Sequence, residues 1–383
     1  MEPLHALGAM SGTSLDGVDA ALVVTDGERI HDFGRSAYLA YTVQQRAVLR
    51  AALGQWQNGP DVAEAAEVVE TVHARVLSRF PEAGLIGFHG QTFAHDPENR
   101  RTHQAGDGAM LAEVLGKPVI WDFRTMDVTL GGEGAPLAPA YHFACAQWMG
   151  ATEPVGFLNL GGVGNLTWVN PVAPDMSDKG ALLAFDTGPA NAPIDDLAQR
   201  HFGHAFDKDG ALADAGRVAT GLVDDLLAHS YFLRKPPKSL DRDSFRQVGA
   251  KIDALPPEDA AATWVAVLVE SVRLGLRHCP TCPKKLLVTG GGRKNPVIMR
   301  ALQDLPTDVA PVEAFGLDGD MLEAQAFGFL AVRVWRGLPT SFPDTTGVRA
   351  SIGGGQVSHP SAGPDVLRGS ARHRRVVGLT NSR

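Results

Sequence analysis

The chain has 383 residues, of which 44% are hydrophobic and 20% are charged, and its formal net charge is −8. A chain of this length predicts about two domains with a sizeable core, and this composition excludes a wholly disordered protein. The excess of negative charge argues against nucleic acid or an anionic membrane surface as a partner.

The cysteine content and the first residues bear on the cellular compartment. Three cysteines are too few for a disulfide scaffold, so we expect a reducing environment. Residues 1–5 have neither the positive charge nor the apolar stretch of a secretory signal. The longest apolar run, near residues 264–269, is far shorter than the ~18 residues of a membrane span. We therefore expect a cytoplasmic protein with no membrane partner.

Glycine clusters divide the chain into periodic segments whose spacing predicts alternating strands and helices. The predicted strands are 4–9, 18–24, 30–41, 85–88, 118–121, 155–160, 166–169, 181–185 and 285–288. The predicted helices are 61–80, with Asp61 as N-cap, 108–115, 138–149, 213–229, 257–276, 296–302 and 320–335. The segment 339–364 is rich in glycine, proline and serine and is expected to be irregular. This alternation is typical of α/β layers with some parallel strands.

A strand, glycine-rich turn and second strand occur twice, near residues 4–24 and 155–169. In the first turn, glycines and hydroxyl side chains allow backbone N–H groups to converge on an anion. The residues concerned are Gly12, Thr13, Ser14 and Gly17. Two carboxylates, Asp16 and Asp19, lie in the same segment, and carboxylates beside a phosphate imply an intervening Mg²⁺. The alternative is a plain hairpin turn with solvated acids.

Two further turns extend this pattern. The turn from Asn159 to Asn165, which contains Gly161 and Gly162, offers a second concave set of N–H groups. The third turn follows a predicted strand, precedes a helix that starts near residue 295, and consists of Gly290, Gly291 and Gly292. Such a turn permits a flat ligand against the backbone. Three turns at strand ends together predict one extended phosphorylated ligand.

Asp186 ends an apolar strand and precedes a Gly-Pro turn. A carboxylate at such a position is partly desolvated and held by rigid backbone, which suits a general base. A helix N-cap or an ordinary turn aspartate is the alternative on position alone.

Six motifs in order give a specific resemblance. They are Gly-Ala-Met-Ser-Gly-Thr-Ser-Leu-Asp-Gly-Val-Asp at 8–19, Phe-His-Gly-Gln-Thr at 88–92, Asp-Phe-Arg at 122–124, Gly-Gly-Glu-Gly-Ala-Pro-Leu at 131–137, Asn-Leu-Gly-Gly at 159–162 and Phe-Asp-Thr-Gly-Pro at 185–189. Together they resemble the anhydro-N-acetylmuramic acid kinases of bacterial cell-wall recycling, over about residues 4–360. The departures, Ala190 where glycine is common and Gly108 in a stretch where proline is common, remove no functional group.

The resemblance implies an α/β, two-lobed actin/hexokinase-like (ribonuclease H-like) kinase fold with ATP in the cleft between the lobes, and a homodimer. One lobe would comprise residues 1–130 with part of the return segment 345–383, and the other 131–344. The implied reaction adds water across the 1,6-anhydro bond and phosphorylates O6, with ATP and Mg²⁺. Its catalytic aspartate falls on Asp186. Its cofactor-binding positions fall on Gly12, Thr13, Ser14, Leu15, Asp16, Gly17, Val18 and Asp19, with Asn159, Gly161, Gly162 and Gly290 to Gly292 at the other turns.

Four more residues are candidate sugar contacts. Arg124 suits the lactyl carboxylate, because a guanidinium group pairs with a carboxylate in a planar fork; a structural ion pair is the alternative. The resemblance places Glu323 near the sugar, although it could equally be an acidic residue of a helix's first turn. His89 and Gln91 either line the cleft or stabilise their turn. Asp16 is the candidate metal residue, acting through water.

Two alternative functions stay open at this point. A conventional hexose or amino-sugar kinase would use Asp186 to deprotonate a hydroxyl directly. A non-catalytic, nucleotide-gated sugar sensor would bind both ligands without turnover, and the presence of Asp186 argues against it.

Overall fold

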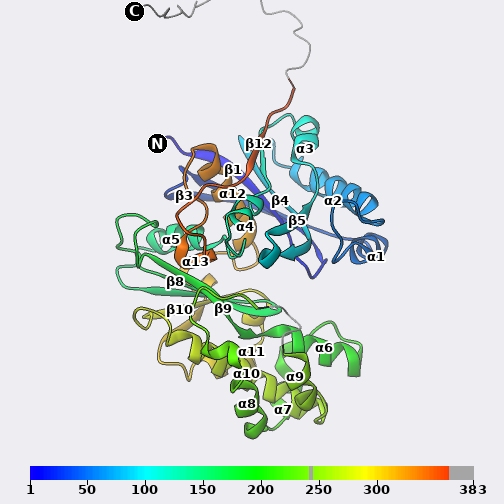
Figure 1. The fold of residues 1–383 in the computed structure, drawn as a ribbon, viewed down its shortest axis with the longest axis vertical. Helices are drawn as coiled ribbons and strands as arrows, with labels where there is room; N and C mark the ends of the chain where they lie inside the picture. The colour runs from blue at the N-terminus through cyan, green and yellow to red at the C-terminus, as the bar shows by residue number, and fades with distance from the viewer. Residues whose placement is uncertain (241–244, 362–383) are drawn as a thin grey trace, which may run out of the picture.

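The computed structural model describes residues 1–240 and 245–361, which form two β-sheets with helices packed around them (Figure 1). The first sheet has the strand order β12-β6-β4-β1-β2-β3, and β5 pairs with β4. Its strands are β1 (Leu4–Ser11), β2 (Gly17–Thr25), β3 (Ile30–Ala40), β4 (Leu85–Asp96), β5 (Arg101–Ala105), β6 (Val119–Trp121) and β12 (Gln356–Ser358).

The second sheet has the order β11-β10-β7-β8-β9. Its strands are β7 (Val155–Leu160), β8 (Val163–Val169), β9 (Leu182–Pro189), β10 (Lys285–Thr289) and β11 (Asp308–Pro311). In each sheet three consecutive strands are antiparallel, and two later strands add in parallel beside the first of them. One topology therefore occurs twice, which is the two-lobed, actin/hexokinase-like architecture that the family resemblance implied.

The helices of the first half are α1 (Val43–Ala51), α2 (Val62–Leu77), α3 (Gly108–Leu115), α4 (Thr125–Thr129) and α5 (Pro139–Trp148). Those of the second half are α6 (Asn191–Phe202), α7 (Ala211–Ala215), α8 (Thr220–Leu227), α9 (Arg246–Asp253), α10 (Pro257–Leu276), α11 (Pro296–Leu302), α12 (Leu322–Trp335) and α13 (Pro343–Thr346). Short 3₁₀ turns, η1 to η5, cover Pro97–Asn99, Lys208–Gly210, Ser230–Leu233, Gly291–Lys294 and Val312–Phe315. No helix among the described residues is long and apolar enough to cross a membrane.

Helix α12 packs on the first sheet although it follows the second sheet in sequence. Two strand glycines make this possible by letting the helix backbone approach closely. A Cβ on Gly8 would lie 1.8 Å from the Ala324 carbonyl oxygen, and one on Gly87 would lie 2.2 Å from that of Phe327. We therefore propose that the first lobe includes α12, which the boundary at residue 344 assigned to the second. Of the return segment, β12 pairs with β6, and residues 362–383 lie outside the described residues.

Hydrophobic side chains form one cluster in each lobe and a third cluster between the lobes. The third cluster joins α5 and α12 to strands of both sheets, for example through Tyr141, Phe157 and Phe329. Each fully buried large side chain contributes about 1.5–3 kcal/mol to stability, so this shared core stabilises the contact between the lobes.

Several predicted elements differ from the structure. Helix α1 was not predicted. The predicted helix 213–229 is two helices, because the extended backbone at Gly216 packs against helix α10; a Cβ there would lie 1.9 Å from the Glu258 carbonyl oxygen. Asp61 occupies the N-cap of α2 but its carboxylate accepts a hydrogen bond from Gln55 instead of capping the helix. Strands β4 and β9 run on through the polar motifs that were predicted to follow them.

Candidate active site

The turn between β1 and β2 is supported from beneath by buried polar side chains. Ser11 Oγ donates to Gln91 Oε1 at 2.6 Å and lies 2.9 Å from the Tyr41 hydroxyl. Gln91 Nε2 in turn donates to the Gly12 carbonyl oxygen at 3.2 Å. Gln91 is completely buried, so this geometry favours the turn-stabilising alternative for it over a direct sugar contact.

The turn residues divide into an exposed set and a buried set. Thr13 and Ser14 are exposed, and the space where a Gly12 Cβ would project is open, with Ser14 Oγ as the nearest atom at 3.7 Å. Leu15 and Val18, in contrast, have their side chains in the core, so they can offer a ligand only backbone groups. Gly17 is required by packing, because a Cβ there would lie 2.5 Å from the Leu39 carbonyl oxygen.

Asp16 and Asp19 differ sharply in environment. The Asp16 carboxylate is exposed and lies 4.0 Å from Arg46. Asp19 is half-buried, and burial together with the negative charge of Glu323, Asp320, Asp318 and Asp16 raises its pKa to about 7. A divalent cation would offset the negative charge that surrounds Asp19, so Asp19 is the better candidate of the two for a metal ligand. The sequence had indicated Asp16 as the metal residue.

The second turn is held by the start of α6. The N–H groups of Ala190 and Asn191 donate to the carbonyl oxygens of Gly162 and Gly161 at 3.1 and 2.9 Å, and Asn191 Nδ2 donates to the Leu160 carbonyl oxygen at 2.9 Å. Cβ atoms on Gly161 and Gly162 would meet no atom closer than 3.4 Å. The outer side of this turn is therefore open to a ligand.

The third turn packs directly on the second. A Cβ on Gly290, whose φ is +75°, would lie 2.3 Å from Asn159 Oδ1, and a Cβ on Gly292 would lie 2.6 Å from Leu160 Cβ. Gly291 is the exposed member of the three. Protein packing thus explains two of these glycines without a ligand, which the sequence alone could not distinguish from close approach by a nucleotide.

Arg124 is held in place by its neighbours in the first lobe. Its Nε donates to His89 Nε2 at 2.9 Å and its Nη1 donates to the Gly134 carbonyl oxygen at 2.6 Å. His89 is buried, and its Nδ1 lies 2.8 Å from the Gly90 carbonyl oxygen. Burial and the charge of Arg124 hold the pKa of His89 well below its usual value, so the neutral ring accepts from Arg124. His89 therefore positions Arg124, and both of its ring nitrogens already have hydrogen-bond partners within the protein.

Glu323, at the start of α12, connects the two lobes. Its Oε1 accepts a hydrogen bond from Asn159 Nδ2 at 2.8 Å. The side chain is open to solvent, yet desolvation by surrounding protein raises its pKa, while Arg124 lowers it. The negative charge of Glu323 in turn raises the pKa of Asp19 beside the first turn. Glu323 brings the first turn, the second turn and Arg124 to one place.

Asp186 lies within β9, not at its end, and has fixed partners on both carboxylate oxygens. Asn165 Nδ2 donates to Oδ1 and the Leu240 N–H donates to Oδ2, both at 2.8 Å. Burial is the largest influence and, with the nearby charge of Glu133, raises its pKa to about 6; the two hydrogen bonds and Lys238 act in the opposite direction. An aspartate of this kind is ionised at neutral pH and more basic than usual, as a general base requires.

Glu133 links the Asp186 region to the Arg124 region and was missed by the sequence reasoning. Its carboxylate accepts from Ser239 Oγ at 2.8 Å, its N–H donates to the Thr346 carbonyl oxygen, and its own carbonyl oxygen lies 2.9 Å from His95 Nε2. The motif at 131–137 was the available signal, but its composition did not indicate which residue mattered. Asn165, Lys238 and the Leu240 N–H were missed because only the fold brings them to Asp186.

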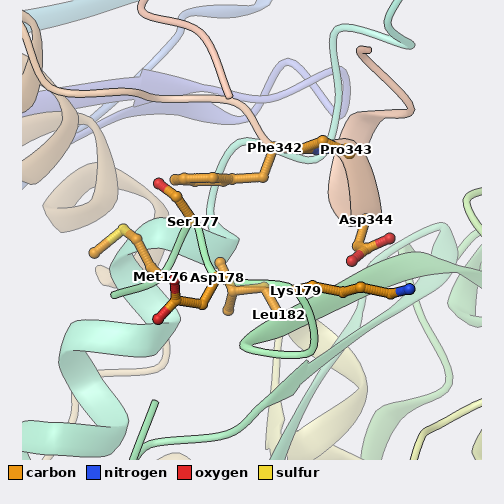
Figure 2. A pocket seen from close by; sticks show the side chains of 8 residues that line it. All are labelled: Met176, Ser177, Asp178, Lys179, Leu182, Phe342, Pro343 and Asp344. Atoms are coloured by element: carbon orange, nitrogen blue, oxygen red, sulfur yellow. The ribbon is translucent and has the colours of Figure 1, made fainter. Parts of the chain in front are cut away.

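Two pockets of the described structure lie away from these residues. One, of about 240 Å³, lies between the loop 176–182 and residues 342–344 (Figure 2). The other, of about 450 Å³, is lined by Arg29, Ile30 and residues of α5 and its C-terminal end. Neither is lined by a residue of the candidate site.

A duplicated sheet topology, glycine turns at matching strand ends and a half-buried carboxylate with a raised pKa on the adjoining strand define a phosphotransferase of the actin/hexokinase-like class. The family model of anhydro-N-acetylmuramic acid kinases matches residues 4–359. The chain therefore belongs to the anhydro-N-acetylmuramic acid kinase family. The predicted family and enzyme class are confirmed, and as a kinase the chain takes its phosphoryl group from ATP.

The similar proteins agree on this family. The chain is 61% identical over 359 residues to the anhydro-N-acetylmuramic acid kinase of Roseobacter denitrificans, covering 94% of this chain and 95% of the relative. It is 60% identical over 358 residues to that of Cereibacter sphaeroides, covering 93% and 96%. Among solved structures, an ADPNP-bound activator of 2-hydroxyisocaproyl-CoA dehydratase from Clostridium difficile has a TM-score of 0.43 at 14% identity, covering 86% and 94%. A xylulose kinase from Rhodospirillum rubrum has a TM-score of 0.40 at 14% identity, covering 93% and 94%.

Proposed function

We propose that the enzyme hydrolyses the 1,6-anhydro bond of 1,6-anhydro-N-acetylmuramic acid and phosphorylates O6 of the same sugar, giving N-acetylmuramate 6-phosphate and ADP. The observation that carries this proposal is Asp186, a half-buried carboxylate held on both oxygens, with a pKa of about 6. Family membership supports the identity of the sugar.

The proposed chemistry uses Asp186 as the general base. Asp186 takes a proton from a water molecule while the water oxygen forms a bond to the anomeric carbon. The bond between that carbon and O6 breaks, and O6 attacks the γ-phosphorus of ATP as ADP leaves. Assistance of this kind by a positioned base is typically worth about 10²–10⁴ in rate. The Asn165 and Leu240 hydrogen bonds fix the carboxylate orientation, so the base does not have to reorganise during the reaction.

We assign the ATP phosphates to the two turns whose outer sides are open. Gly12, Thr13 and Ser14 on one lobe, with Gly161 and Gly162 on the other, offer backbone N–H groups and hydroxyls to an anion. The third turn, Gly290 to Gly292, is adjacent and is proposed for the adenosine, with Gly291 as its exposed member.

A Mg²⁺ ion at Asp19 is the proposed metal. The raised pKa of Asp19, surrounded by other carboxylates, fits a group that a cation would stabilise. When bound, Mg²⁺ neutralises charge on the transferring phosphoryl group. Asp19 would hold it directly or through water, and Asp16 would act only from the exposed edge.

Arg124 and Glu323 are the proposed sugar contacts. His89 and Gly134 occupy Nε and Nη1 of Arg124, which leaves Nη2 for an acidic group such as the lactyl carboxylate. Glu323 is the proposed acceptor for a sugar hydroxyl or amide. His89 and Gln91 are proposed to act through Arg124 and the first turn.

Two further expectations belong with this function. The cysteines are free, with Cys145 buried, Cys279 half-buried and Cys282 exposed, which supports a reducing compartment such as the cytoplasm. A homodimer is proposed from the family resemblance, and light scattering at several protein concentrations tests it.

The test is ADP release with MgATP and 1,6-anhydro-N-acetylmuramic acid, with N-acetylmuramic acid and N-acetylglucosamine in parallel. Turnover only with the anhydro sugar, together with solvent ¹⁸O at the anomeric position of the product, supports the proposal. Turnover with a reducing sugar and no ¹⁸O incorporation would replace it with a conventional sugar kinase. Binding of both ligands without turnover would indicate a sensor.

A further inference from the structure

Lys238 is a buried lysine close to the proposed base. Only 4% of the residue is exposed. Its Nζ donates to the Tyr231 carbonyl oxygen at 3.3 Å and lies 4.4 Å from the centre of the Tyr231 ring and 5.9 Å from that of Phe185. A buried ammonium group is costly unless other groups compensate its charge. The aromatic faces supply part of this compensation.

The backbone around Lys238 is bonded to Asp186 at several points. The Asp186 N–H donates to the Lys238 carbonyl oxygen at 3.0 Å, and the Leu240 N–H donates to Asp186 Oδ2 at 2.8 Å. The Tyr231 hydroxyl donates to the Asp186 carbonyl oxygen. The Lys238 side chain therefore connects two segments, 230–233 and 238–240, that both contact Asp186.

We infer that Lys238 is a positioning residue for the base: its buried ammonium group, bonded to the Tyr231 carbonyl oxygen, fixes the segment that brings the Leu240 N–H onto the Asp186 carboxylate and places a positive charge near that carboxylate. The inference rests on the proposed function for Asp186 and goes beyond it, because it assigns to a second residue the control of when the base is ready to accept a proton.

The charges around Asp186 and Lys238 support a lowering of the pKa of Asp186 by Lys238. The charges of Asp186 and Lys238 stabilise each other, while Glu133 opposes ionisation of Asp186 and Arg234 opposes ionisation of Lys238. His278 also faces Lys238. Burial and Arg234 lower the pKa of Lys238 to about 8, which is still above the value of about 6 for Asp186. Lys238 is therefore charged throughout the range in which Asp186 titrates, and removal of that charge must raise the pKa of Asp186.

The experiment compares Lys238→Met and Lys238→Gln, which remove the charge, with Lys238→Arg, which keeps it. For the two neutral variants we expect the acidic limb of the kcat profile between pH 5 and 9 to move about one unit toward higher pH. This means about a tenfold loss below the limb and little change at pH 8.5, with the sugar KM unchanged. Lys238→Arg should keep the wild-type limb. Lys235→Met is the matched control, because it removes an exposed lysine three positions away.

Two results would overturn the inference and leave Lys238 with a purely structural role. One is a loss of kcat that is the same at every pH, and the other is an acidic limb of the kcat profile that stays in place in both neutral variants. Thermal unfolding identifies a variant that fails to fold, in which case the second neutral variant decides. The ¹³C carboxyl shift of Asp186 followed against pH gives the same comparison without turnover. A pKa of Asp186 that rises in this titration, in a protein without anhydro-sugar activity, would leave the inference standing and reject the proposed function.

Discussion

The two lobes repeat one strand order, yet the third strand of each has a different environment. In the first lobe β3 has mostly exposed side chains, including Asp32. In the second lobe β9 is largely buried, covered by α10 and by the segment that contains Lys238. An exposed strand such as β3 does not desolvate its carboxylates, whereas burial on β9 raises the pKa of Asp186. The duplicated topology thus supplies positions, and local packing decides which of them can support catalysis.

The turns of the two lobes differ in a similar way. Buried side chains, Ser11 and Gln91, hold the first turn, and carboxylates lie beside it. Backbone N–H groups at the start of α6 hold the second turn, where the adjacent polar residues are Asn159 and Asn165. A negative field on one side and amide donors on the other suit a metal-bound phosphate chain that lies between the turns.

The largest expected effect comes from Asp186→Asn. The amide keeps the shape but cannot accept the proton, so kcat should fall by about 10²–10⁴ while ATP still binds with unchanged affinity. Steady-state kinetics and nucleotide titration measure the two effects separately. Asp32→Asn, on the exposed strand of the first lobe, is the matched control and should leave kcat unchanged. A kcat of Asp186→Asn within tenfold of the wild-type value would mean that β9 carries no catalytic base and does not differ from β3 in this respect.

A smaller loss is expected for Arg124→Lys. The single ammonium group of lysine lacks the planar fork that lets Arg124 contact His89 and Gly134 and still direct a third donor at the sugar. A lost charge-assisted hydrogen bond of about 1.5–3 kcal/mol predicts a sugar KM about ten to a hundred times higher, with the ATP KM unchanged. Arg50→Lys, at the exposed end of α1, serves as control. An unchanged sugar KM would mean that Arg124 has a structural role only.

The sequence predicted much of this architecture because its signals are local. Alternation and glycine breaks located most strands, and α10 and α11 were predicted with the bounds that the structure has. Asp186 stood out because it follows a short apolar run. The partners of Asp186 could not be predicted, since Asn165, Leu240 and Lys238 reach it only through pairing of β8 with β9 and through a loop more than fifty positions away.

The glycines show a second limit. A glycine that makes room for a neighbouring backbone and one that makes room for a ligand have the same sequence signature. Gly12 lies in a turn predicted to bind phosphate and Gly290 in a turn predicted to hold a flat ligand, but only Gly290 is closely packed against the protein. His89 and Gln91 were grouped with substrate contacts for a related reason, because burial is a property of the fold and not of the motif.

Alanine substitutions separate these two kinds of glycine. Gly290→Ala places a Cβ 2.3 Å from Asn159 Oδ1 at a φ of +75°, so it should lower the free energy of unfolding by about 2 kcal/mol. Gly12→Ala projects into open space and should change that free energy by less than about 0.5 kcal/mol, while raising the ATP KM. Urea unfolding and kinetics on both variants provide the comparison. Equal stability of the two variants would contradict the packing explanation.

The smallest expected effect is on how stability depends on pH, and it tests the negative field at the first turn. The folded protein binds a proton at Asp19 up to a pKa of about 7, whereas the ordinary value is 3.8. Between these values the folded state holds more protons than the unfolded state, so stability is greatest below the window and falls as pH rises through it. Asp19→Asn removes this contribution. After allowance for solvent screening at a partly open site, we expect the variant to gain about 1 kcal/mol relative to wild type between pH 4 and pH 8.

Urea unfolding of the metal-free protein at pH 4 and pH 8 measures this difference, and Asp186 affects wild type and variant alike, so their difference isolates Asp19. Asp16→Asn, at the exposed carboxylate of the same turn, is the control: it keeps Asp19 and removes only the weakest of the charges that raise the pKa of Asp19, so it should stay close to the wild-type slope. If the free energy of unfolding depends on pH in the same way for Asp19→Asn and wild type, the carboxylates around Asp19 do not destabilise the metal-free protein. A flattened profile for Asp19→Asn would instead show that the carboxylates around Asp19 repel one another until a cation binds.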